Sequence, residues 1–233
     1  MKNKLLVITG GTKGIGRALI HQFAQENFDI VTCSRHEADL KELQEEITTA
    51  YGVTLSYREA DLASKEATLA FADFVKALDR PIDVLINNAG FFQPSAITTE
   101  PDELFEKTMS INVFSVYYFT KALLPTLSKE ASVFNICSIA SNTILSNCGA
   151  YGISKFALLG FSKILREELK NQQIKVTSVL PGATFTAAWD GSDIDPARIM
   201  PAKDVAKAVW GCYTLSTQSV VEELTIRPQL GDL

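Results

Sequence analysis

Histidine and cysteine are scarce in this sequence of 233 residues, which has two of the former and four of the latter. Cys33, Cys137, Cys148 and Cys212 follow neither the spacing of a metal site nor the density of a disulfide-stabilised secreted protein. We therefore expect no metal site, and we expect the cysteines to be free or buried thiols in a reducing cytoplasm.

Long apolar runs and an excess of positive charge are also missing. No stretch approaches the roughly 20 apolar residues that a membrane-spanning helix needs, and the apolar run at residues 5–8 is too short for a cleaved secretion signal. The net charge of −5 provides no basic field for the phosphate backbone of a nucleic acid. The sequence thus predicts a cytoplasmic protein that binds neither a membrane nor a nucleic acid.

What the chain does contain is a regular alternation of two patterns. Short runs rich in β-branched and aliphatic residues predict strands at 4–9, 29–33, 54–59, 82–86, 132–137, 175–179 and 220–226. Helical periodicity lies between them, near 14–26, 37–50, 64–79, 101–128, 150–171 and 201–213. Such alternation favours a doubly wound, Rossmann-type α/β fold, in which helices cover both faces of a seven-stranded parallel sheet.

No internal repeat or flexible linker divides the chain, so we expect a single domain over residues 1–233. Residues 181–200 are the least regular part, because prolines and glycines interrupt any periodicity there. They follow the sixth predicted strand, at the sheet edge where open α/β folds bind ligands. A substrate loop is therefore expected at 181–200, as either a mobile lid or a solvated connection.

A glycine-rich turn, TGGTKGIGR at residues 9–17, joins the first predicted strand to the first helix. Glycines let backbone N–H groups approach a pyrophosphate, and the helix N-terminus adds the positive end of its dipole. Glycines also serve tight turns for steric reasons alone, but the position of this turn favours a dinucleotide site. The candidate cofactor-binding residues here are Gly10, Thr12, Lys13, Gly14, Ile15 and Gly16.

The end of the second predicted strand indicates which dinucleotide is bound. An NAD site places an acidic residue against the ribose 2′-hydroxyl here, whereas this chain has Ser34 and Arg35 and no carboxylate before Glu37. Arg35 is suited to bidentate phosphate binding, and Lys13 would add a second positive charge. Each is compatible with an ordinary solvated side chain, but their coincidence with the missing acid favours NADP(H).

Tyr151 and Lys155 are the candidate catalytic pair, because their spacing places them on one face of a predicted helix. The apolar run 156–161 follows, and an ammonium beside such a run needs a specific role. A phenol with a pKa of about 10 is a poor proton donor at neutral pH, and a neighbouring cation favours its ionised form. Tyr151 would thus protonate a carbonyl oxygen while hydride arrives at the carbon. Ser138, at the end of the fifth predicted strand, would hydrogen-bond to the same oxygen.

Together these residues resemble the short-chain dehydrogenase/reductase family, whose Gly-x3-Gly-x-Gly turn and Ser, Tyr and Lys set are matched here. The resemblance extends from residue 5 to about residue 186 and adds Asn112 to the catalytic set, as the residue that kinks the fourth helix and holds a water. One departure is Thr184, where an aliphatic residue is usual. The resemblance implies these further cofactor contacts: Asp61, Leu62, Asn88, Ala89, Gly90, Tyr151, Lys155, Pro181, Gly182, Thr184 and Thr186.

The same resemblance implies a reductase that transfers hydride from NADPH to a small ketone, assembled as a homodimer or homotetramer through the apolar helix 101–128. Residues 222–233 resemble the C-terminal segment of bacterial sepiapterin-reductase-like members. The predicted pocket residues are mostly apolar: Phe91, Phe92, Ile139, Ile144, Cys148, Phe185 and Trp189. Two alternatives stay open, a 3-oxoacyl-thioester reductase of the same family and a non-catalytic NADP(H)-sensing protein.

Overall fold

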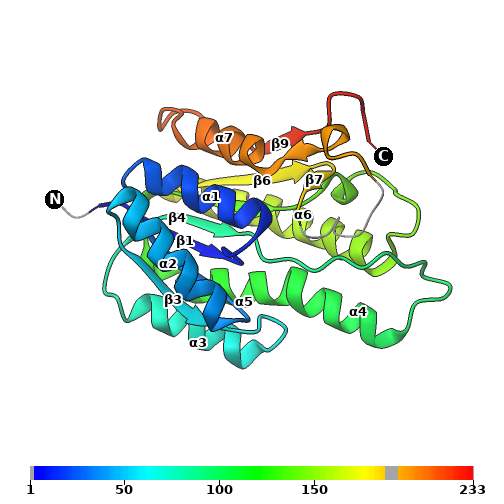
Figure 1. Cartoon of the computed structure of the whole chain (residues 1–233), viewed down its shortest axis with the longest axis horizontal. Coiled ribbons are helices and arrows are strands. Elements are labelled where there is room, and N and C mark those ends of the chain that lie inside the picture. The colour runs from blue at the N-terminus through cyan, green and yellow to red at the C-terminus, as the bar shows by residue number, and fades with distance from the viewer. Residues whose placement is uncertain (1–2, 187–193, 233) are drawn as a thin grey trace.

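The computed structural model describes residues 3–186 and 194–232, in which seven strands form one parallel sheet (Figure 1). The strands are β1 (Leu5–Thr9), β2 (Asp29–Ser34), β3 (Leu55–Glu59), β4 (Ile82–Asn87), β5 (Leu127–Ile136), β6 (Lys175–Pro181) and β9 (Glu223–Ile226). Their order in the sheet is β3-β2-β1-β4-β5-β6-β9, so the winding of the chain reverses between β1 and β4. The predicted doubly wound α/β fold with seven parallel strands is confirmed.

Two large hydrophobic cores, one on each face of the sheet, hold the helices in place. One face carries α1 (Gly14–Gln25), α2 (Glu37–Tyr51) and α7 (Ala202–Tyr213), and the other carries α3 (Lys65–Lys76), α5 (Ser115–Leu123) and α6 (Gly149–Leu169). Strand β1 divides between them, because Leu6 and Ile8 belong to the first core and Leu5 and Val7 to the second. Burial of both faces explains why the strand sequence is continuously apolar.

The largest differences from the predicted elements are in helix 101–128 and strand 132–137, and β9 also begins at residue 223 rather than 220. The helix predicted at 101–128 consists of α4 (Asp102–Met109), which packs against α6, then a π-helical turn (Ser110–Phe114) and then α5. Strand β5 begins at residue 127 rather than 132. The prediction missed its first residues because the pattern of apolar residues is interrupted there, where the β4–β5 register shifts. Glu130, at this irregularity, has a φ of 65°. Neither the π-helical turn nor the irregular start of β5 can be recognised from the pattern of apolar residues.

The predicted substrate loop at 181–200 contains a small element of regular structure. Its strand β7 (Thr184–Phe185) pairs in parallel with β8 (Met200–Pro201). Arg198, between them in sequence, donates hydrogen bonds to three main-chain oxygens of residues 230–232. The C-terminal segment is thereby attached to the loop, which the sequence pattern did not indicate.

Composition-based expectations can be compared with the described residues. All four cysteines are free thiols, as predicted. Within the described residues, 3–186 and 194–232, no helix combines the length and apolar character needed to cross a bilayer. The same residues contain no group of three His, Cys, Asp or Glu side chains that could hold a metal ion. The predicted pocket residue Trp189 and the middle of the predicted substrate loop 181–200 fall within residues 187–193, which lie outside the described residues.

Candidate functional site

The carboxyl ends of the parallel strands bring distant segments to one edge of the sheet. Gly10, just after β1, donates its N–H to the Cys33 oxygen of β2 at 3.0 Å. The other candidate residues end or follow successive strands: Ser34 and Arg35 at β2, Asp61 and Leu62 after β3, Asn88, Ala89 and Gly90 after β4, Ser138 after β5, and Pro181 and Gly182 at β6. The edge includes the β1/β4 position where the strand order reverses, which is where open α/β sheets bind ligands.

The glycine-rich turn is tied to the segment after β4. Asn88 Nδ2 donates to the main-chain oxygens of Thr9 and Gly10, both at 2.9 Å, and Thr9 Oγ1 accepts the N–H groups of Asn88 and Ala89 at 3.0 Å. Gly10 has a φ of 69°, and a Cβ there would lie 3.0 Å from the Ala89 Cα. A Cβ at Gly16 would lie 2.2 Å from the Gly10 oxygen. Packing within the protein therefore requires both glycines.

The start of α1 has the donor chemistry of an anion site. Its N-cap residue, Lys13, caps no N–H with its side chain, and the first turn carries no acidic residue. The first N–H groups of a helix lack partners within the helix and lie at the positive end of its dipole. Gly14, Ile15 and Gly16 supply these groups, and Gly14 has a φ of 54°. This turn therefore fits the diphosphate of a dinucleotide.

The two predicted phosphate-binding cations differ in their surroundings. Arg35 is exposed just beyond β2 and forms no ion pair in the part of the chain that the structure describes. Lys13 Nζ lies 3.4 Å from the carboxylate of Asp39 in α2, a residue that sequence reasoning missed. Ser34 is part of a local turn, because its Oγ donates to the His36 oxygen at 3.2 Å. Since an exposed ion pair contributes little free energy, a dianionic phosphate can compete with Asp39 for Lys13.

Ser138 is held at the end of β5 by the short 3₁₀ turn Ile139–Ser141. Its Oγ accepts the N–H of Ala140 at 3.1 Å, and Ser141 Oγ accepts the N–H of Ser138 at 3.2 Å. This reciprocal cap fixes the hydroxyl oxygen and does not use the hydroxyl hydrogen. Ser138 can therefore donate a hydrogen bond to an oxygen at the sheet edge.

Lys155 is a buried lysine, with only 5% of its surface exposed. Its Nζ donates to the Ile136 oxygen at 2.9 Å and lies 5.6 Å from the centre of the Tyr151 ring. A Cβ at Gly90 would lie 3.7 Å from this Nζ and 3.6 Å from Asn112 Oδ1, so the ammonium borders the segment after β4. An ammonium has three N–H donors, and the bond to Ile136 uses one of them.

The thiol of Cys137 lies next to Ser138 in the chain and close to the same ammonium. Burial raises the pKa of Cys137 to about 11, and the positive charge of Lys155 acts in the opposite direction. The thiol therefore stays protonated at neutral pH and is not a nucleophile.

Asn112 connects the segment after β4 with the helix that carries Tyr151. Its Oδ1 accepts the N–H of Phe91 at 2.7 Å, and its Nδ2 donates to the Phe91 oxygen at 3.0 Å and to Ser154 Oγ at 2.9 Å. Ser154 in turn donates to the main-chain oxygen of Tyr151 at 2.7 Å. Sequence reasoning missed Ser154, although a serine directly before Lys155 on the buried face of the helix was the available signal.

The predicted pocket residues are distributed unevenly around Tyr151. Phe92 packs edge-on against the Tyr151 ring, with 4.8 Å between the ring centres. Ile144 is 86% exposed, so its predicted role in lining the pocket has the least support from the structure. Ile139 is buried, Cys148 is half-buried and Phe185 is exposed. The Phe92 ring beside the Tyr151 phenol is thus the clearest feature of the predicted pocket.

The segment after β6 reaches the glycine-rich turn. The N–H of Gly182 donates to the Ile226 oxygen at 2.8 Å, and Thr184 Oγ1 donates to the Gly182 oxygen at 2.9 Å. A Cβ at Gly14 would lie 2.9 Å from Thr186 Cγ2. The predicted contacts from the first and sixth strand ends are therefore adjacent in space.

Known proteins are similar to this chain over nearly its full length. The sepiapterin reductase of Chlorobaculum tepidum is 30% identical over an alignment of 239 positions, which covers 98% of each chain. The L-sorbose reductase of Gluconobacter frateurii, solved with NADPH and L-sorbose, is 25% identical with a TM-score of 0.88, covering 98% of this chain and 96% of that one. The RhlG/NADP complex of Pseudomonas aeruginosa is 26% identical with a TM-score of 0.88, covering 97% and 96%.

The family assignment follows from two of these comparisons. The family model for short chain dehydrogenases matches residues 4–195, which is most of the chain. The sepiapterin reductase relative reaches its 30% identity over almost the whole of both chains, and the fold has the parallel sheet order described above. This chain therefore belongs to the short-chain dehydrogenase/reductase family of oxidoreductases.

Proposed function

We propose that this protein is an NADPH-dependent reductase that acts on a small ketone, with Tyr151 as the general acid. The observation that carries the proposal is the buried Lys155, whose ammonium lies 5.6 Å from the centre of the Tyr151 ring at the ligand-binding edge of the sheet. A buried charge is costly unless partners compensate it, and such groups in a site are candidates for a functional role. Ser138 and Asn112 complete the proposed catalytic set.

Each of these side chains has a distinct proposed task. NADPH, when bound, supplies the hydride that reaches the carbonyl carbon. Tyr151 donates its phenolic proton to the carbonyl oxygen, and Ser138 donates a hydrogen bond to the same oxygen. The positive charge of Lys155 stabilises the phenolate that remains. Asn112 keeps the helix with Tyr151 against the segment after β4.

The proposed cofactor is NADP(H), with its diphosphate at the start of α1 and its 2′-phosphate at Arg35 and Lys13. The first N–H groups of α1, which have no partner within the helix, and the exposed guanidinium of Arg35 support this placement. Two family structures of 25% and 26% identity contain NADPH and NADP, which supports the same cofactor here. The residues after β3, β4 and β6 are proposed to contact the adenine, the ribose and the nicotinamide.

The proposal also covers the organisation of the chain. Among the described residues, every strand except those of the β7–β8 pair joins one sheet, which supports a single domain over residues 1–233. Four free cysteines support a reducing, cytoplasmic location.

The substrate is proposed to be a small, uncharged ketone such as a diketone. Lysine and arginine are absent from 90–106 and 139–154, and Arg198 already binds the C-terminal segment. Lys107 is a basic residue close to the predicted pocket, with its Nζ 4.4 Å from the centre of the Phe91 ring. A strongly anionic carrier therefore has little basic surface near Tyr151. The relative named sepiapterin reductase, at 30% identity, supports a pteridine with a diketone side chain as one of the compounds to test.

Initial rates of NADPH consumption test both the function and the substrate class. We expect 1-phenyl-1,2-propanedione and the pteridine diketone to have a higher kcat/KM than an acetoacetyl thioester. Pocket contacts contribute only about 1–3 kcal/mol each, so several ketones are expected to react at comparable rates. Preference for the thioester would replace this substrate by an acyl chain, and NADPH binding without turnover of any compound would favour the sensing role.

A dimer or tetramer is proposed to form through the exposed apolar face of α5 and α6. The large apolar side chains left exposed are Phe114 at the end of the π-helical turn, Tyr117 in α5, and Phe156 and Ile164 in α6. Large apolar side chains that gather in a patch on a protein surface mark interaction sites. We expect light scattering to give the mass of a dimer or tetramer at micromolar concentration, and Tyr117→Glu to shift the mass toward the monomer. A native protein of strictly monomeric mass would contradict this assembly.

A further inference from the structure

The loop between β4 and α4 is joined to the segment that starts α6. The N–H of Ser95 donates to the Asn147 oxygen at 2.9 Å, and the N–H of Gly149 donates to the Ser95 oxygen at 2.8 Å. These bonds make an isolated parallel bridge between Ser95 and Cys148. The loop and the first turn of the helix that carries Tyr151 therefore form one connected unit.

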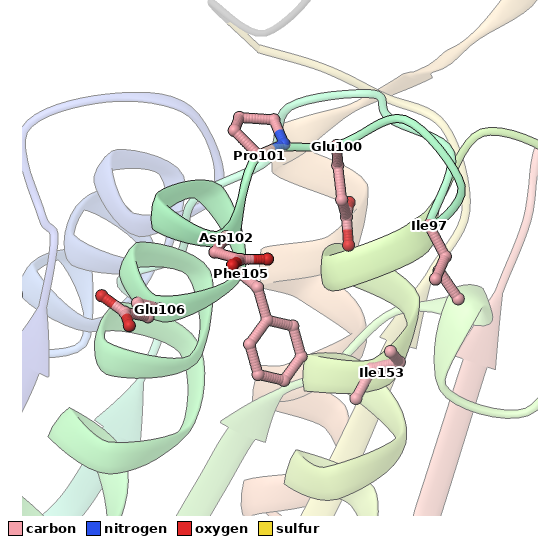
Figure 2. Close-up of a pocket in the computed structure, with 7 residues that line it drawn as sticks. All are labelled: Ile97, Glu100, Pro101, Asp102, Phe105, Glu106 and Ile153. Carbon is pink, nitrogen blue, oxygen red and sulfur yellow. The ribbon is translucent and has the colours of Figure 1, made fainter.

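Glu100 places a carboxylate inside this unit. Its Oε2 accepts the N–H of Ala150 at 3.1 Å and also accepts the hydroxyl of Ser95. Figure 2 shows the side chain extending from the loop toward the start of α6. A Cβ at Gly149 would lie 2.7 Å from the same oxygen, so a glycine at this position permits the close approach.

The carboxylate caps α6 from a different part of the chain. The helix's own N-cap residue, Cys148, makes no side-chain cap, and its first turn has no acidic residue. A carboxylate at a helix N-terminus satisfies an N–H that has no partner within the helix and interacts favourably with the helix dipole. Ala150, whose N–H donates this bond, directly precedes Tyr151, while Phe92 of the same loop packs on the Tyr151 ring.

We propose that Glu100 is a positioning residue for catalysis, which fixes the first turn of α6 so that the Tyr151 hydroxyl meets the carbonyl oxygen. This inference rests on the proposed function and deepens it. Two other acids, Asp102 and Glu106, line the same cavity of about 370 Å³ from α4 (Figure 2). In the described part of the chain, Glu100 is the acid that hydrogen-bonds to the start of α6, which makes Glu106 a matched control.

Three variants separate the position of the acceptor oxygen from its charge. Glu100→Gln keeps an oxygen at the same distance and removes the charge, Glu100→Asp keeps the charge and withdraws the oxygen by one methylene, and Glu100→Ala removes both. With saturating NADPH and 1-phenyl-1,2-propanedione, we expect the Gln variant to keep kcat within about threefold. The Asp and Ala variants should lose at least about tenfold, because small displacements of a catalytic group are costly. NADPH Kd should stay unchanged in all three, and Glu106→Ala should match the native protein.

The outcomes distinguish this inference from the proposed function. Any of three results would overturn the role of Glu100. They are an active Asp variant beside an impaired Gln variant, an equal kcat in the Gln and Asp variants, and the full native kcat in the Ala variant. If Glu100→Ala does not fold, the Gln and Asp pair decides. Tyr151→Phe is measured alongside: activity in that variant removes the proposed function itself, whereas its inactivity beside a fully active Glu100→Ala removes only the present inference.

Discussion

Replacing Tyr151 by phenylalanine is expected to lower kcat at least about a hundredfold, because a positioned general acid typically contributes 10²–10⁴-fold. The phenylalanine ring keeps the edge-on packing with Phe92, and the bond from Lys155 to the Ile136 oxygen does not involve the lost hydroxyl. The melting temperature and the Kd for NADPH should therefore stay close to those of the native protein. Steady-state NADPH consumption with 1-phenyl-1,2-propanedione and a fluorescence titration of NADPH measure the two effects separately.

A second tyrosine provides the control for this experiment. Tyr57 lies half-buried on β3, on the α1 and α2 face of the sheet, and Tyr57→Phe removes the same hydroxyl group away from the proposed catalytic set. That variant should keep the native kcat. Full turnover in Tyr151→Phe would show that the proton comes from a group other than the Tyr151 hydroxyl.

The fold could be predicted from the sequence because burial on both faces leaves a plain apolar pattern. Strand β1 is the clearest case, since Leu6 and Ile8 enter one core while Leu5 and Val7 enter the other. The errors occur where tertiary contacts override a local pattern. Periodicity predicted an uninterrupted helix over 101–128, although the resemblance to the family implied a kink at Asn112. The π-helical turn observed there accompanies two hydrogen bonds between the Asn112 side chain and the main chain of Phe91, which no local periodicity can reveal.

The site could be predicted in part for a similar reason. The spacing of Tyr151 and Lys155 indicates that they share a helix face, but the bond of Lys155 to the Ile136 oxygen depends on how the helix packs on the sheet. Asp39 and Glu100 had no recognisable signal, because each acts on a residue from a distant segment. Local motifs thus identified the groups proposed to react, and the structure was needed to find the groups that hold them.

Arg35→Asp is expected to weaken NADPH binding by roughly 2–4 kcal/mol, or about 30- to 1000-fold in Kd, and to spare NADH. The change removes a charge-assisted bond to the 2′-phosphate and adds a repulsion that NADH, which lacks this phosphate, does not experience. The fold should tolerate the change, because Arg35 is exposed and has no ion pair within the described residues.

Lys13 is not expected to compensate for the lost guanidinium, because its charge already contributes to the proposed phosphate site in the native protein, where the phosphate competes with the Asp39 carboxylate, 3.4 Å from Lys13 Nζ. The first turn of α2 already carries Glu37 and Asp39, so the aspartate variant would add a third carboxylate to this part of the chain. Lys41→Asp makes the same charge change further along α2 and should alter neither Kd by more than about twofold. Both dinucleotides are titrated at one fixed ionic strength, since screening changes the repulsion. Equal Kd values for NADPH and NADH in the native protein would contradict the selection of the cofactor by Arg35.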